Sequence, residues 1–75
     1  MILPDKHTPP ERSLLAVGGL LLGHLSRPLT VNRLWERVRE DPIVRSYDAF
    51  MLTVAFLYAV GALDEHDGQL TKSPA

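Results

Sequence analysis

Residues 46–63 read SYDAFMLTVAFLYAVGAL and lead into a turn-bearing segment, residues 64–72, that reads DEHDGQLTK. The first stretch contains no Lys or Arg and predicts a long helix. At helical spacing, the side expected to face the core carries Tyr47, Phe50, Met51, Val54, Leu57, Tyr58 and Gly61. The opposite side is also apolar, with Ala49, Leu52, Phe56, Ala59 and Val60. A helix that is apolar all round has to be covered on more than one side, by the chain itself or by a partner.

Local signals mark the ends of this helix and the hairpin that follows it. Ser46 is a good N-cap, Asp48 faces the positive end of the helix dipole, and Gly61 can close the helix in a left-handed conformation. Asp67-Gly68 predicts a two-residue hairpin turn. The turn sets the register, with the expected pairs His66–Gln69, Glu65–Leu70, Asp64–Thr71 and Leu63–Lys72. In that register Leu63 and Leu70 share the inner face.

A first helix is expected upstream, from about residues 11–13 to Leu25. Its apolar residues at helical spacing, expected in the core, are Leu14, Val17, Leu21 and Leu25. Gly19 and Gly23 are costly inside a helix and stand four apart, which predicts that another helix of the chain approaches closely there.

A second helix is expected over Val31–Glu40. Pro28 ends the first helix, Leu29 gives a short extended piece, and Thr30 is a good N-cap for the second. The side chains expected to turn inward are Val31, Leu34, Trp35 and Val38. Asp41-Pro42 should end this helix.

The order of elements is helix, short strand, helix, helix, hairpin. It predicts a mainly α protein with a small β-hairpin, organised as a winged helix-turn-helix domain over residues 11–72. Residues 46–60 then hold the position of the recognition helix. Residues 1–10 contain several prolines and are expected to form an extended arm, and residues 73–75 a frayed tail.

Composition narrows the class of protein further. The chain has 75 residues, 45% of them hydrophobic, with no Cys and a net charge of −1. A chain this short has a thin stability margin, which a partner would widen, and it carries no general basic field for nucleic acid or anionic membranes. The apolar run Leu14–Leu25 is shorter than the roughly 20 residues that span a bilayer. We therefore expect a soluble cytoplasmic protein without a membrane segment, with a secretory signal as the alternative.

The sequence predicts no enzyme. His7, His24 and His66 fall on three different elements and lack metal-ligand spacing. The acidic residues of the hairpin lack the spacing of a calcium loop, and no glycine-rich phosphate loop followed by Lys occurs. We expect no catalytic residue, cofactor, metal or small-molecule ligand.

DNA binding by a transcriptional regulator is the alternative function that the fold order prompts. Base readout needs Arg, Lys, Asn or Gln, yet the non-core side of the long helix carries Asp48, Ala49, Leu52, Ala55, Phe56 and Ala59. The acidic hairpin would repel phosphate. The candidates for a weak contact with a nucleic-acid backbone are Arg33, Arg37 and Arg39.

Protein docking is the function that the same surface favours. The apolar stripe on the long helix consists of Ala49, Leu52, Phe56 and Val60, and the candidates in the arm are Ile2, Leu3, Lys6 and His7. Two alternatives stay open: the arm, the first helix and the hairpin cover the stripe from within, or a second copy covers it in a homodimer.

Four segments resemble one small family of bacterial proteins. They are MILPDKH at 1–7, SLLAVGG from Ser13, PLTVNRLWE at 28–36, and YDAF and FLYAVGAL within 47–63. They look like the sixth group of middle components of ABC-three-component systems. The resemblance implies a winged-helix adaptor between an ABC- or SMC-like ATPase and an effector, in systems proposed to act against phages. Enzyme activity would then belong to the partners. The Ala-rich side of the long helix departs from more polar relatives and weakens any nucleic-acid role.

Overall fold

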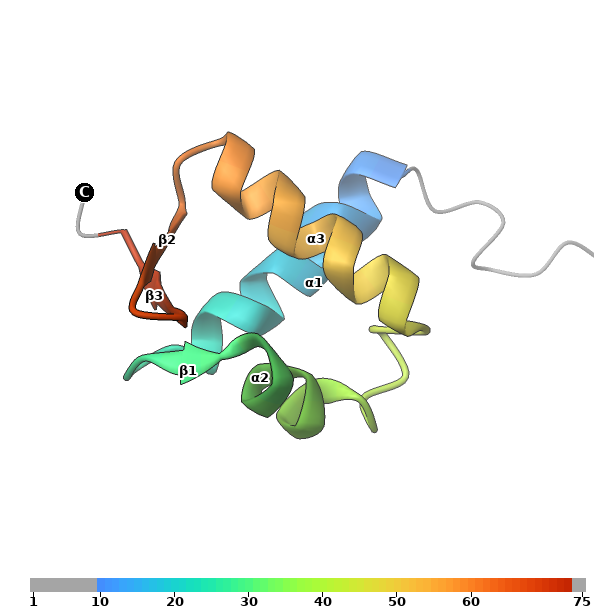
Figure 1. The fold of residues 1–75 in the computed structure, drawn as a ribbon. Coiled ribbons are helices and arrows are strands. Elements are labelled where there is room, and N and C mark those ends of the chain that lie inside the picture. The colour runs from blue at the N-terminus through green and yellow to red at the C-terminus, as the bar shows by residue number, and fades with distance from the viewer. Residues whose placement is uncertain (1–9, 74–75) are drawn as a thin grey trace, which may run out of the picture.

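The computed structural model describes residues 10–73, and its elements follow the predicted order (Figure 1). Within these residues the bounds are α1 Pro10–Gly23, β1 Leu29–Thr30, α2 Val31–Val38, α3 Tyr47–Ala59, β2 Leu63–His66 and β3 Gln69–Lys72. The helices are predominant and the strands short, as the sequence predicted. The helix–strand–helix–helix–hairpin order is that of a winged helix-turn-helix domain. The predicted arm and tail lie almost entirely outside the described residues.

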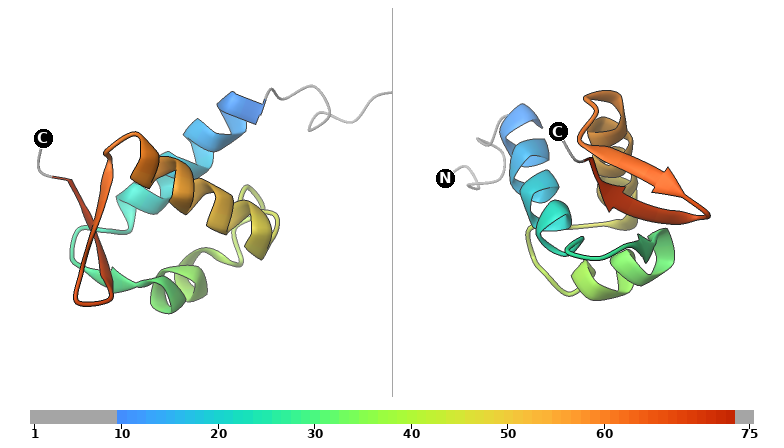
Figure 2. Two further views of the ribbon diagram at one scale, coloured as in Figure 1. Left: turned by 45° about the horizontal axis from the view of Figure 1, so that its top comes forward. Right: turned by 90° about the vertical axis from the view of Figure 1, so that its left-hand side faces the viewer.

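The three strands form one small antiparallel sheet in the order β1-β3-β2. The hairpin has the predicted register, from Leu63 opposite Lys72 to His66 opposite Gln69. Asp67 and Gly68 both have positive φ, 52° and 77°, which is the type I′ turn that suits the twist of a hairpin. The third strand is the short extended piece at Leu29, which pairs with Leu70. Figure 2 shows the hairpin as a projecting ribbon beside the helices.

The core lies where the three helices meet the inner face of the sheet. Its buried apolar residues are Val17, Leu21, Leu25, Leu29, Leu34, Val38, Val44, Phe50, Val54, Leu57, Leu63 and Leu70. Each element contributes at least one of them, including the loop before α3 through Val44. Most of the predicted inward residues of the first two helices are buried in this core. Val31 and Trp35 are partly buried against it, and Leu14 is partly buried outside it.

Two predicted helix ends are wrong by two residues. α1 ends at Gly23 rather than Leu25, because His24 and Leu25 donate their N–H groups to carbonyls three residues back, at 3.1 and 3.0 Å, in a tightened last turn. α2 ends at Val38 rather than Glu40. The backbone turns there because Asp41 precedes a proline and its carboxylate accepts from the N–H of Ile43 at 3.0 Å.

The predicted core face of α3 is partly wrong. Tyr47, Met51 and Tyr58 are exposed, whereas Thr53 is only 1% exposed. The buried face of α3 is thus turned toward Thr53, whose hydroxyl donates to the carbonyl of Ala49 at 2.8 Å and is satisfied without a tertiary partner. None of the helices within residues 10–73 is long and apolar enough to cross a membrane.

Candidate protein-docking surface

Both ends of α3 are fixed by capping. The Ser46 hydroxyl accepts from the N–H of Ala49 at 3.1 Å, as its position at the N-cap predicted. At the other end Gly61 has φ +79°, and its N–H donates to the carbonyl of Tyr58 at 3.1 Å. The N–H of Ala62 donates to the carbonyl of Leu57 at 2.9 Å, which completes a Schellman motif. Both ends of α3 are therefore fixed, and the positions of its exposed side chains are well defined.

α1 packs against α3 through Gly18. A Cβ atom at Gly18 would lie 3.2 Å from Cδ2 of Leu57, so any larger residue would have to push the Leu57 side chain aside to keep the two helices this close. The prediction that Gly19 and Gly23 make the close helix contact is wrong, because no atom of another element lies within 4 Å of the Cβ position at either residue. The small-residue principle holds, but the contact is one residue earlier on the helix.

The predicted docking stripe lies along the side of α3 that faces α1. Leu52 and Val60 are 61% and 58% exposed, and Leu15 on α1 is 65% exposed. Ala49 and Phe56 are half-buried, and Phe56 packs against the core. α1 therefore covers part of the stripe, as one alternative expected, and leaves its larger side chains at the surface.

The space between α1 and α3 forms an apolar groove of about 450 Å³, which we name the α1–α3 groove. Its described lining residues are Leu14, Leu15, Gly18, Gly19, Leu22, Phe56, Leu57, Val60 and Ala62. A second hollow of about 180 Å³ shares Leu14 and extends to Ala49, Leu52 and Ile43. The two hollows give one continuous apolar face over α1 and α3, and among the described lining residues Arg45 is the charged one.

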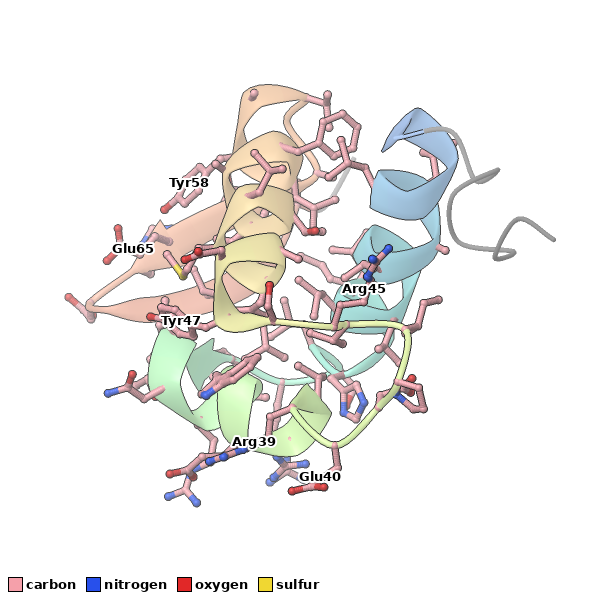
Figure 3. The ribbon with its side chains drawn as sticks, turned by 90° about the vertical axis from the view of Figure 1, so that its right-hand side faces the viewer. Arg39, Glu40, Arg45, Tyr47, Tyr58 and Glu65 are labelled. Atoms are coloured by element: carbon pink, nitrogen blue, oxygen red, sulfur yellow. The ribbon has the colours of Figure 1, made fainter. Side chains whose placement is uncertain are left out.

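The opposite side of α3 forms a second groove, between α3 and the hairpin, that the sequence did not predict. This α3–wing groove has a volume of about 290 Å³ and is lined by Val31, Met51, Val54, Ala55, Tyr58, Glu65 and Leu70. The Tyr58 hydroxyl donates to Oε1 of Glu65 at 3.2 Å, and Figure 3 shows the two side chains pointing toward one another. Desolvation raises the pKa of Tyr58, and the carboxylates of Glu65 and Asp64 raise it further. Tyr58 therefore remains a neutral donor at physiological pH.

The apolar pattern of α3 did not reveal this second groove, because it does not separate exposed from buried residues. Tyr47, Met51 and Tyr58 match the apolar period of α3 as well as the truly buried residues do. Tyr47 completes an aromatic cluster at the surface, with its ring centroid 5.1 Å from that of Trp35 and 5.8 Å from that of Phe50. The polar hydroxyl of Tyr and the flexible thioether of Met both suit the edge of a core, and this is the one indication that could have placed Met51 and Tyr58 at the rim.

The candidate nucleic-acid contacts lie on and just after α2. Arg33 forms an exposed ion pair with Glu36 at 3.8 Å, and the Arg39 guanidinium lies 5.8 Å from the centroid of the Trp35 ring. Arg37 is exposed on the same helix. Figure 3 shows Arg39 beside Glu40, well away from Tyr58 and Glu65. The exposed residues of α3 are Tyr47, Asp48, Met51, Leu52, Ala55, Tyr58 and Ala59, and none of them is a Lys, Arg, Asn or Gln that could read a base.

The remaining predictions from the sequence concern the N-terminal arm and metal binding. The arm candidates Ile2, Leu3, Lys6 and His7 lie outside the described residues, and their docking remains a prediction. Among residues 10–73, no three His, Cys, Asp or Glu side chains are grouped so that they could hold a metal ion.

The fold and the surface define a small three-helix domain with a β-hairpin wing and an exposed apolar face over α1 and α3. The chain belongs to the family described as ABC-three component (ABC-3C) system Middle Component 6, whose model matches residues 3–73. The resemblance seen in the sequence motifs is confirmed. As a middle component of a three-component ABC system, the chain has partner components. No curated protein and no solved structure matches it.

Proposed function

We propose that this chain is a non-enzymatic cytoplasmic adaptor that binds the ABC- or SMC-like ATPase and the effector of its own system. It would link the state of the ATPase to the action of the effector by protein–protein docking. The biological setting that the family suggests is defence against phages and other invading elements. Membership in a family of middle components supports this proposal.

The observation that carries the proposal is the exposed apolar face over α1 and α3. Leu15, Leu52 and Val60 project from two helices whose relative position is fixed by the Gly18 contact. Large exposed apolar side chains around a groove are typical of a protein interface, and a partner helix laid along the α1–α3 groove would bury them.

Co-purification with the ATPase subunit of the same system tests the proposal. Leu15→Asp and Leu52→Asp each place a carboxylate on the apolar face. Because both positions are mostly exposed, the two variant proteins should fold like the wild type. Burial of an unpaired carboxylate in the interface should weaken binding at least about tenfold. Phe56→Asp is a poorer choice because Phe56 packs against the core.

Asn32→Asp is the matched control. Asn32 is exposed on α2, outside the lining of either groove, and receives the same new charge. The control should co-purify like the wild type. Normal binding by both Leu15→Asp and Leu52→Asp would show that this face is not the docking surface.

A further inference from the structure

α3 has a second exposed apolar flank, which faces the hairpin and not α1. Met51 and Tyr58 stand one above the other on this flank and line the α3–wing groove with Ala55 and Val54. Leu70, which is buried in the sheet, forms the floor of the groove. This surface is separate from the α1–α3 groove, because the residues that line the two grooves do not overlap.

The edge of the α3–wing groove is acidic. Glu65 lines it directly and is held in place by the Tyr58 hydroxyl at 3.2 Å. Asp64 is the residue before Glu65 on β2 and is exposed, and it lies close enough to act on the pKa of Tyr58. The cation of the hairpin, Lys72, stands two positions along β3 from Leu70, the residue opposite Glu65. Lys72 does not line the groove, and among the described residues Glu65 is the one charged residue that does.

We propose that the α3–wing groove binds a segment of a partner protein that carries Arg or Lys among apolar side chains. The apolar residues would occupy the floor between Met51 and Leu70. A cation at the edge would pair with the Glu65 carboxylate, and its alkyl stem would lie on the Tyr58 ring. The same carboxylates repel phosphate, so the groove selects a basic peptide and not a nucleic acid.

The position of the α3–wing groove would allow the protein to bind a second partner. The two grooves lie on opposite flanks of α3, so two partners can occupy them at the same time. This inference adds a surface to the adaptor proposed above and does not depend on which partner binds the α1–α3 groove.

A designed peptide that repeats Leu and Arg at helical spacing tests the inference, with a second peptide in which every Arg is Gln. Binding is followed by NMR of the isotope-labelled full chain, which identifies the residues in contact. The Arg peptide should shift the resonances of Met51, Ala55, Tyr58 and Glu65. Loss of its charge should weaken binding about tenfold, or about 1.4 kcal/mol.

Substitutions in the protein complete the test. Asp64→Asn with Glu65→Gln removes the two charges, keeps an acceptor for Tyr58, and should also weaken the Arg peptide about tenfold. Glu40→Gln, which removes an exposed carboxylate far from the groove, should have no effect.

Four results would overturn the inference. The Gln peptide would bind as tightly as the Arg peptide, or the Arg peptide would shift α1 and not the α3–wing groove, or neither peptide would bind at millimolar concentration. Self-association that disappears with the Asp64→Asn and Glu65→Gln pair would assign the groove to a second copy and would equally overturn it.

Discussion

Replacement of Gly18 by Val should strongly destabilise the protein, whereas the same change at Gly19 should not. The Cβ at position 18 would fall 3.2 Å from Cδ2 of Leu57 and 3.9 Å from Cγ2 of Thr53, and both side chains are buried. Overpacking of this kind costs about 1–3 kcal/mol. The better helix propensity of Val compared with Gly offsets only about a few tenths of a kcal/mol of this cost. For a domain of this size the loss corresponds to a fall in Tm of roughly 4–20 °C.

The matched variant Gly19→Val isolates the effect of space. It changes helix propensity by the same amount in the same turn of α1, but nothing lies within 4 Å of the Cβ position. Thermal melts followed by circular dichroism should give Gly19→Val a Tm equal to or slightly above that of the wild type. Equal Tm values for the two Val variants would refute the α1–α3 packing described above. Because Gly19 lines the α1–α3 groove, Gly19→Val should also weaken docking while the fold stays stable.

Three further outcomes are expected. Ser46→Ala removes the N-cap of α3 and should cost about 1 kcal/mol in urea unfolding, and an unchanged midpoint would contradict the capping role. An NMR pH titration should place the pKa of Tyr58 above its ordinary value, and Glu65→Gln should lower it. Because the folded pKa is the raised one, the associated stability is intact below the ordinary tyrosine pKa and declines as pH rises through the folded value. Duplex DNA should bind at most weakly at low salt, through Arg33 and Arg37. Tight sequence-specific binding would contradict the conclusion that α3 lacks side chains that read bases.

Local signals made most of the fold predictable from the sequence. Ser46, Gly61 and the Asp67-Gly68 turn each act within a few residues of the chain, and all three have the predicted geometry. The pairing of Leu29 with Leu70 was beyond such signals, because it joins residues far apart in the sequence. The order of elements, including the short strand at Leu29, was therefore predictable, whereas the pairing of that strand with β3 was not.

The candidate site was less predictable because α3 is apolar on nearly every side. Period alone could not distinguish Met51 and Tyr58, which are exposed, from Val54 and Leu57, which are buried. Thr53 was overlooked because a hydroxyl is rarely expected in a core, although a helix carbonyl satisfies it here. Leu52 and Val60 were placed correctly at the surface, but the α3–wing groove needed the position of the hairpin.

The measurement that tests the adaptor role most directly is assembly of the three purified subunits. The ATPase and the effector of the system would be mixed with and without this chain, and the complexes separated by analytical ultracentrifugation. The account predicts that the ATPase and the effector sediment together only when the chain is present, and that Leu52→Asp abolishes the joint species. Equally stable assembly of the ATPase and the effector without the chain would contradict it.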